Sequence, residues 1–423
     1  MTARQTHVLT ARIGAYDPDE VEAYRHAGGY EGLLRALEMG PAGVIAAIKE
    51  AGLTGRGGAG FPTGVKWQAA ASEARQPKYL ICNADEGELG TLKDRLLLEG
   101  DPWLVLEGIT IAAFAAGAGK AYIYIKGDYA DIAERWERMV AQASAAGLLG
   151  EGVLGSGFDL SLRVARGRGP YIAGEELALL ASLEMRRAHS RPKPPYPSER
   201  GFMGQPTVVN NVETLAYVPL IIQRGAAWFR SMGVPNDPGT RLFSVTGDVK
   251  RPGVYEVEMG SATLRSLIED LAGGTADGRP IKAVQPGGGT SAMLPNGRLD
   301  VSLTTAAIRE AGSVIGTGAV IVYEEGVRDI VQVCHGLVDF YCDESCGGCA
   351  PCRIGTSQSK AIFQRLMAGQ GTEADLQHLD QIGAVCERVA TCGLGQTFLA
   401  PVRSAMRLFP EEFARYAPAG ESR

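Results

Sequence analysis

Four cysteines near the C-terminal end have the spacing of an iron–sulfur site. Cys346, Cys349 and Cys352 recur every third residue in ESCGGCAPCR, and Cys392 follows later in TCGLG. Three thiolates with this spacing can bind one side of a cubane, and a distant fourth thiolate completes the ligand set. Four thiolates also suit tetrahedral zinc, but zinc sites favour two paired CxxC motifs. The spacing therefore favours a 4Fe-4S cluster, with structural zinc as the alternative.

The remaining cysteines lie in apolar stretches of the chain: Cys82, Cys334, Cys342 and Cys386. A free cysteine in such a setting commonly packs as a small buried hydrophobe. We therefore expect these four to be structural.

A glycine-dense loop over residues 55–62 (GRGGAGFP) matches the dinucleotide fingerprint GxGxxG at Gly55, Gly57 and Gly60. That fingerprint should follow a strand and open a helix, whereas a helical pattern over 43–51 precedes this loop. We expect the loop to hold phosphate groups in a different topology. A Rossmann loop and a purely structural turn are the alternatives.

Two acidic clusters follow predicted strands. Residues 83–88 (NADEGE) come directly after the apolar run 78–82, and residues 169–176 (GPYIAGEE) come after a strand predicted over 159–165. Open α/β sheets bind ligands at the carboxyl ends of their strands. Carboxylates there suit ribose and ribityl hydroxyls, a nicotinamide amide and flavin edges. The alternative is that they are solvated loop charges.

A third segment, residues 191–197 (RPKPPYP), is stiffened by four prolines and is followed by the amides and hydroxyl of NNVET at 210–214. Proline-rich stretches are often exposed linkers. Here the combination of rigid, basic and aromatic residues predicts a wall for a dinucleotide.

Three successive patterns must position these residues. Predicted strands and helices alternate up to about residue 240, which favours an α/β domain on a mainly parallel sheet. The ranges are 17–25, 32–39, 43–51, 103–116 and 131–146 for helices, and 78–82, 121–126 and 159–165 for strands. Residues 241–326 predict a small β domain with strands at 241–247, 254–258 and 281–284 and a helix at 263–271. Residues 327–423 predict helices at 329–344, 355–367, 373–385 and 401–408. We thus expect domains at 1–240, including an N-terminal arm, 241–326 and 327–423.

Composition excludes several classes of protein. The net charge is −6 and basic residues are scattered, whereas a nucleic-acid platform needs clustered Lys and Arg. The first sixteen residues lack the apolar stretch of a signal peptide. The longest nearly apolar run, 109–118, is about half the length of a membrane helix. We expect a cytoplasmic protein with no nucleic-acid partner and no direct membrane insertion.

Taken together, five motifs resemble the NADH-binding flavoprotein subunit family of respiratory complex I and its relatives in NAD-reducing hydrogenases, NAD-dependent formate dehydrogenases and NAD-linked tungsten aldehyde oxidoreductases. They are GRGGAGFPTGVKW, NADEGELGTLKDR, GPYIAGEE, QPTVVNNVET and ESCGGCAPCR with TCGLG, in this order from about residue 52 to 395.

The resemblance implies a flavin, FMN in complex I, although the residues do not exclude FAD. By this likeness the flavin contacts Gly55, Arg56, Gly57, Gly58, Gly60, Lys66, Asn83, Asp85, Tyr171, Gly174, Glu175, Asn210, Asn211 and Thr214. NADH would lie near Phe61, Glu86, Glu88 and Glu176, with Lys193 and Tyr196 on its approach side, and Glu86 and Glu176 are the candidate catalytic residues. The same likeness assigns Cys346, Cys349, Cys352 and Cys392 to the cluster and a ubiquitin-like β-grasp fold to 241–326.

The implied function is an NAD(H) oxidoreductase subunit that works with other iron–sulfur subunits. Gly87 in NADEG and the ending CGLGQT look more like the soluble hydrogenase and formate dehydrogenase relatives. A soluble formate-, hydrogen- or aldehyde-linked complex is therefore expected, and complex I is the alternative. Ala69 stands where complex I relatives usually carry an adenine-stacking aromatic residue. A non-catalytic scaffold with structural zinc is the alternative from another class.

Overall fold

The computed structural model describes residues 2–418 of the 423-residue chain. Its N-terminal part is built on a parallel four-stranded sheet in the order β3-β2-β1-β4. The strands are β1 (Tyr79–Ala84), β2 (Lys120–Ile125), β3 (Ser161–Arg166) and β4 (Thr207–Asn211). In register, Ile81 lies opposite Tyr122 and Val209. The predicted parallel sheet is confirmed.

Helices cover both faces of this sheet because its central strand buries side chains on both sides. Leu80 and Cys82 belong to one apolar cluster, and the alternating Tyr79 and Ile81 belong to another. A continuous apolar run such as KYLIC is typical of a parallel strand with two covered faces. The helices of this part are α1 (Val21–His26), α2 (Glu31–Ala51), α3 (Thr63–Ser72), α4 (Lys93–Gly100), α5 (Pro102–Ala116), α6 (Ala130–Ala145), α7 (Glu176–Leu183), α8 (Pro197–Arg200), α9 (Val212–Arg224) and α10 (Ala226–Arg230).

Helix α5 is the central helix of this part and packs against both α2 and α9. Nearly every residue of α5 is buried, so the apolar run noted in the sequence is a core helix. Asp101 caps its first turn by accepting a hydrogen bond from Leu104 N at 3.3 Å. The helix ends at Gly117, whose φ of 71° requires a glycine-like conformation.

The second part is a five-stranded sheet in the order β10-β9-β11-β7-β8. Its strands are β7 (Thr240–Gly247), β8 (Gly253–Glu258), β9 (Ile281–Gln285), β10 (Leu294–Pro295) and β11 (Ala319–Glu324), after a small β5 (Gly233–Val234) and β6 (Asp237–Pro238) pair. The predicted helix forms as α11 (Leu264–Ser266), continued by a π-helical turn over Leu267–Leu271. Strands β10 and β11 and helix α12 (Thr305–Glu310) were not predicted. Central β11 pairs in parallel with β7 and antiparallel with β9.

The N-terminal arm lies on this second part. The carboxylate of Glu256, which is fully buried, accepts hydrogen bonds from the backbone N–H groups of Val8, Leu9 and Thr10 at 2.9–3.1 Å. The arm therefore joins the first α/β part to strand β8 before the chain enters its first helix.

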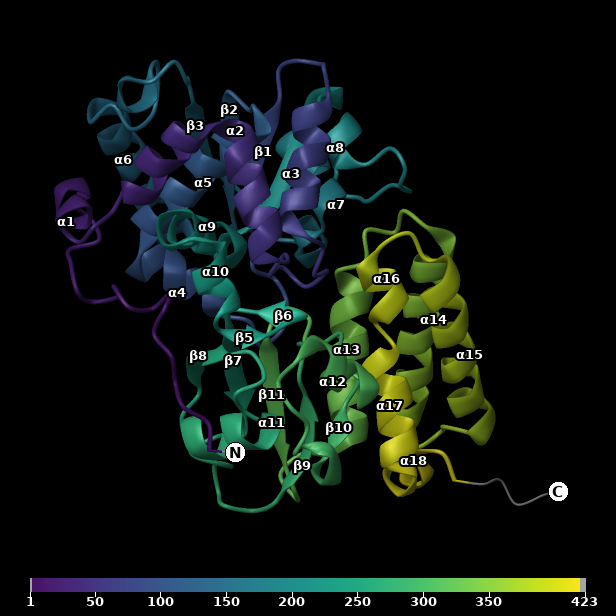
Figure 1. Ribbon diagram of the computed structural model, residues 1–423. Helices are drawn as coiled ribbons and strands as arrows, with labels where there is room; N and C mark the ends of the chain where they lie inside the picture. Colours follow the sequence, from purple (N-terminus) through teal and green to yellow (C-terminus); the bar gives the residue numbers. More distant parts are fainter. Residues whose placement is uncertain (1, 419–423) are drawn as a thin grey trace.

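The third part is helical, as predicted, and lies at the right in Figure 1. It contains α13 (Ile330–Asp343), α14 (Ala350–Met367), α15 (Glu373–Val389), α16 (Gly393–Thr397), α17 (Ala400–Leu408) and α18 (Pro410–Tyr416) around one apolar cluster. Over residues 2–418, none of the helices is both long and apolar enough to cross a membrane.

Candidate functional site

The two acidic clusters meet at the carboxyl end of the parallel sheet. Asn83, at the end of β1, donates a hydrogen bond from Nδ2 to the carbonyl oxygen of Gly174 at 2.8 Å. A Cβ atom at Gly174 would lie 3.1 Å from the carbonyl oxygen of Asp85, so a glycine allows the two segments to approach closely. The structure thus brings together clusters that are far apart in the sequence.

The glycine loop lies against the same sheet end. Gly55 N donates to the carbonyl oxygen of Phe61 at 2.9 Å, which closes the loop between α2 and α3. Arg56 N donates to Thr214 Oγ1 at 2.8 Å, and a Cβ atom at Gly57 would lie 3.1 Å from Asn211 Cβ. The loop follows a helix, so the expectation of a topology other than Rossmann is confirmed.

The amides after β4 are fixed from both sides. Asn210 Oδ1 accepts a hydrogen bond from Trp67 Nε1 at 2.8 Å. Asn211 Nδ2 donates to Asp94 Oδ2 at 2.6 Å, while its Oδ1 accepts from Glu213 N at 3.1 Å and caps α9. These amides are rigid parts of the sheet edge.

The guanidinium group of Arg56 lies in the junction with the second part. It is 1% exposed and donates to the carbonyl oxygens of Pro238 and Thr240 at 3.3 and 3.4 Å. The backbone of Arg56 is therefore part of the glycine loop, whereas its guanidinium group points into the junction with the second part.

Asp85 is a buried carboxylate with a free acceptor. Its Oδ2 atom is buried and has no hydrogen-bond partner among the described residues. Burial, together with the nearby negative charges of Asp128 and Glu344, raises the pKa of Asp85 to about 7 against the effect of Lys126. An unpaired buried acceptor is costly, and a flavin offers N–H and hydroxyl donors, so this residue fits such a ligand.

Glu86, predicted to be catalytic, caps the first turn of α4. Its two carboxylate oxygens accept hydrogen bonds from Asp94 N at 2.7 Å and Arg95 N at 3.1 Å. Burial and the charge of Asp94 raise the pKa of Glu86 to about 7. A carboxylate used in this way has a structural task whatever it does for a ligand.

The second catalytic candidate, Glu176, is paired with two lysines. Lys66 Nζ lies 3.3 Å from Glu176 Oε2, and Lys193 Nζ forms an ion pair with Oε1. Burial by itself would raise the pKa of Glu176, but the two lysines hold it below its ordinary value. Its neighbour Glu175 caps α7 by accepting from Leu177 N and Ala178 N. The two lysines therefore keep Glu176 ionised.

Tyr171 connects the site to the helical part. Its hydroxyl donates to Glu88 Oε2 at 2.5 Å, and its backbone N–H donates to Glu344 Oε2 at 2.6 Å. The ring of Tyr171 also makes edge contacts with Phe340 and Tyr341 at centroid distances of 5.5 and 5.9 Å. Glu344 lies two residues before the first predicted cluster ligand.

Phe61 and Tyr196, expected beside NADH, are 50% and 52% exposed. Their rings are thus accessible to a ligand.

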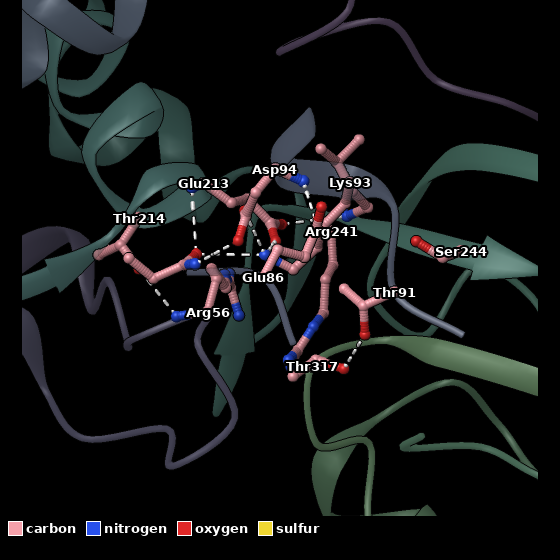
Figure 2. A network of polar contacts seen from close by, with 12 residues as sticks. Arg56, Glu86, Thr91, Lys93, Asp94, Glu213, Thr214, Arg241, Ser244 and Thr317 are labelled. Atoms are coloured by element: carbon pink, nitrogen blue, oxygen red, sulfur yellow. Dashed lines mark hydrogen bonds and ion pairs between the residues drawn. The ribbon is translucent and has the colours of Figure 1, made fainter. Parts of the chain in front are cut away.

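A buried ionic network at this sheet edge was missed by the sequence analysis (Figure 2). Lys93 Nζ lies 2.7 Å from Asp94 Oδ1 and 3.1 Å from Glu213 Oε2. Arg241 adds a second buried cation whose Nε has no hydrogen-bond partner among the described residues. Breaking a buried ion pair typically costs about 3–5 kcal/mol, so this network fixes the sheet edge. Lys93 and Asp94 lie in the motif NADEGELGTLKDR, but the motif does not indicate that both residues are buried.

The four predicted cluster ligands gather at the end of the helical part. Burial and the charges of Cys349, Cys392 and Cys346 raise the pKa of Cys352 to about 12, while Ser345 opposes the shift. Such mutual repulsion of thiolates is relieved by bound iron, so the donor set fits the cluster. Among residues 2–418, no three His, Cys, Asp or Glu side chains form a site for a single metal ion.

Nearby backbone N–H groups act to lower the pKa of two of the cluster thiols. For Cys392 they are those of Gly395 and Leu394, and for Cys349 they are those of Thr391 and Cys352. Burial opposes the effect, but these hydrogen bonds bring the pKa of Cys349 below its ordinary value. The other cysteines behave as expected: Cys82, Cys334 and Cys386 are buried and Cys342 is half-buried.

Comparison with protein families finds three matches in order along the chain. Residues 48–220 match the Nuo51 FMN-binding domain, residues 241–322 match an SLBB domain, and residues 332–416 match the NADH-ubiquinone oxidoreductase-F iron-sulfur binding region. The last match favours iron–sulfur over structural zinc at the four cysteines.

Several known proteins are similar over almost the whole chain. An NADH-quinone oxidoreductase subunit of Rhizobium meliloti is 43% identical over 410 residues, covering 97% of each chain. NADP-reducing hydrogenase subunit HndC of Solidesulfovibrio fructosivorans is 41% identical over 97% of this chain and 83% of its own. A crystal structure of NAD+-reducing [NiFe]-hydrogenase in the H2-reduced state matches with a TM-score of 0.85 and 34% identity, covering 99% of this chain and 68% of that one.

Proposed function

The chain belongs to the family of proteins that combine a Nuo51 FMN-binding domain with the NADH-ubiquinone oxidoreductase-F iron-sulfur binding region, and from this premise we propose how its residues work. The chain exchanges hydride between NAD(H) and bound FMN and single electrons with a 4Fe-4S cluster. Cys346, Cys349, Cys352 and Cys392 hold the cluster.

One observation carries this proposal: Tyr171 contacts both the acidic clusters at the sheet end and the helical part. It lies in the second acidic cluster, and its backbone bonds to Glu344 beside the cluster loop. The ring of Tyr171 also packs edge-on against Phe340 and Tyr341 of the helical part. A flavin at the sheet end would therefore lie next to the cluster, which short-range electron exchange requires.

We assign the flavin side of the pocket to the glycine loop and the sheet edge. The residues are Gly55, Arg56 through its backbone, Gly57, Gly58, Gly60, Lys66, Asn83, Asp85, Tyr171, Gly174, Glu175, Asn210, Asn211 and Thr214. The nucleotide side comprises Phe61, Glu86, Glu88, Glu176, Lys193 and Tyr196. The free Oδ2 of Asp85 supports the first assignment, and the exposed ring of Phe61 supports the second.

These side chains orient the reactants, because hydride transfer needs close stacking more than acid–base groups. When bound, FMN supplies the exchange between one hydride and two single electrons. Glu176 is held ionised by Lys66 and Lys193, so it can accept hydrogen bonds from a nicotinamide amide or a ribose. Glu86 acts by fixing the loop between β1 and α4.

We propose that the chain works beside other iron–sulfur subunits in a soluble, cytoplasmic NAD-linked complex. Similarity to the NAD+-reducing [NiFe]-hydrogenase structure and to HndC supports a hydrogen-linked partner. The 43% identity to an NADH-quinone oxidoreductase subunit supports a complex I-type assembly as the second candidate. Mass spectrometry of proteins that co-purify with the chain distinguishes hydrogenase subunits from quinone-side subunits.

We also propose the domain bounds 1–240, 241–326 and 327–423, with a ubiquitin-like β-grasp fold for the middle domain. Adjacent, parallel β7 and β11 at the centre of its mixed sheet support that fold.

The test of the function is a visible spectrum of the anaerobically purified chain before and after NADH. We expect a flavin band and a broad iron–sulfur absorption that both bleach when NADH is added. A colourless protein that contains zinc would contradict the proposal.

A further inference from the structure

The loop from Asp85 to Leu92, here called the acidic loop, is held by the second part of the chain. Thr91 Oγ1 is hydrogen-bonded to Thr317 Oγ1 at 2.8 Å, and Leu92 N donates to Ser244 Oγ at 3.0 Å. Glu88 Oε1 accepts a hydrogen bond from Thr290 N at 3.1 Å. Three positions of one short loop are therefore fixed by another domain.

Two glycines make this contact too close for a side chain. A Cβ atom at Gly90 would lie 2.8 Å from Ile321 Cγ1, and one at Gly288 would lie 2.6 Å from Glu88 Cγ. Both glycines also have positive φ, of 83° and 93°. At each of these places the backbone of a glycine packs directly against a side chain of the other part. This close packing is an observation separate from the three hydrogen bonds.

Thr317 has a special place in this contact because it also reaches the glycine loop. A Cβ atom at Gly58 would lie 3.7 Å from Thr317 Cγ2. Arg241 fixes this turn of the second part by donating to the carbonyl oxygen of Gly316. Figure 2 shows Thr317 paired with Thr91, next to Arg241. Thr317 thus presents its hydroxyl to the acidic loop and its methyl group to the glycine loop.

We propose that the second part is a template for the nucleotide site, and that Thr317 is its positioning residue. It keeps the acidic loop at a fixed distance from the glycine loop, so that Glu88 stays on the nucleotide side of the site while the flavin stays bound. This inference deepens the proposed function and rests on it for the ligand, but the mechanical link between the two domains stands on the contacts alone.

Two conservative variants separate the role of the Thr317 hydroxyl from that of its methyl group. Thr317→Val keeps the methyl group near Gly58 and removes the hydroxyl that bonds Thr91, whereas Thr317→Ser does the reverse. For Thr317→Val we expect KM for NADH to rise roughly threefold to tenfold, as the loss of one hydrogen bond implies, with kcat and flavin content nearly unchanged. Thr317→Ser should keep KM within about twofold of wild type, since it retains that bond.

A second readout does not depend on turnover. Hydrogen–deuterium exchange of Thr317→Val should increase in peptides covering residues 85–92 and stay unchanged in α5. Thr91→Val should reproduce both effects, and the double variant should be no worse than either single variant, because both remove the same bond. Thr305→Val, which alters an exposed threonine of the same domain, is the matched control.

Unchanged exchange over 85–92 in Thr317→Val, or additive effects in the double variant, would overturn the inference. A wild-type protein that binds no flavin would instead refute the proposed function, and the exchange experiment would still report on the link between domains.

Discussion

Several carboxylates of the site are buried, and the partners that each one finds in the interior determine whether it can bind a ligand or holds the backbone. Asp85 and Glu86 are adjacent and both buried, yet one has a free acceptor and the other caps a helix. Glu176 is the acid that its lysine neighbours keep ionised. These differences predict how each side chain responds to substitution.

Glu176→Gln should weaken NADH use and leave flavin content unchanged. The variant removes a charged acceptor, so KM for NADH should rise roughly tenfold or more, as expected for about 1.5–3 kcal/mol. The folded pKa of Glu176 is lowered, so its ion pairs persist above the ordinary glutamate value of about 4.3 and are lost only as pH falls through the lowered value. KM should thus show no titration of this group between about pH 5 and 8. Exposed Glu137→Gln is the control, and an unchanged KM in Glu176→Gln would make the carboxylate a bystander.

Asp85→Asn should change how stability depends on pH in the chain without flavin. Asp85 has a folded pKa of about 7 and an unfolded value of about 3.9, so its contribution to stability is present below about pH 4 and is lost as pH rises to about 7. The variant should therefore be more stable than wild type at pH 8, by about 1–3 kcal/mol, and this advantage should shrink at pH 5. Chemical denaturation at both pH values measures the difference, with exposed Asp277→Asn in the second part as control. Equal differences at pH 5 and 8 would mean that Asp85 does not bind a proton in this range.

Cys352→Ser should abolish the cluster and keep the flavin. The cysteine loop packs on the core of the helical part, whereas the strands of the parallel sheet belong to other apolar clusters. Iron analysis and electron paramagnetic resonance should show loss of the cluster, while the flavin band remains. Cys342→Ser, outside the predicted ligand set, should retain full iron content. Loss of flavin in a folded Cys352→Ser protein would contradict separate sites.

Among the elements, loops and arms do more positioning than the regular structure does. The sheet provides a common edge, but the acidic loop and the N-terminal arm are fixed by side chains of the second part. The glycine loop is fixed by Thr214 of α9. Glu256 shows this most clearly, since it binds three successive backbone N–H groups of the arm.

Glu256→Ala should free the arm and destabilise the protein. The variant leaves several donors without a charged acceptor, so the free energy of unfolding should fall by about 2–3 kcal/mol. Limited proteolysis within residues 2–12 should accelerate at the same time. Exposed Glu310→Ala should change neither quantity. An arm that stays protected in Glu256→Ala would mean that its apolar contacts are sufficient.

The molecule as a whole contains an FMN-binding domain and an iron–sulfur binding region, and no family match along the chain points to chemistry on formate, hydrogen or an aldehyde. We therefore expect the purified chain to reduce ferricyanide with NADH under anaerobic conditions. It should fail to reduce NAD+ with formate, hydrogen or an aldehyde, because that chemistry needs a partner subunit. NAD+ reduction by any of these substrates with the single chain would contradict its assignment as a subunit.

Local sequence patterns predict much of this organisation. Three features depend only on neighbours in the chain, so the sequence predicts them. They are the spacing of Cys346, Cys349 and Cys352, the apolar run KYLIC and the helical periodicity after residue 327. The order of the three parts follows from the same signals. Strand β11 was missed although AVIVYE is apolar, because a short apolar run has no periodicity that separates strand from helix.

Contacts between residues far apart in the chain depend instead on how the domains pack. Arg56 lies in a phosphate-type motif, yet its guanidinium is drawn into the junction by the carbonyl oxygens of Pro238 and Thr240. Glu86 became a helix cap because α4 begins within reach of its carboxylate. Thr317 belongs to no motif, and its role arises only where the second part meets Thr91 and Gly58. Burial and distance are properties of the packed chain, and these two quantities decide which polar residues face a ligand and which hold the protein together.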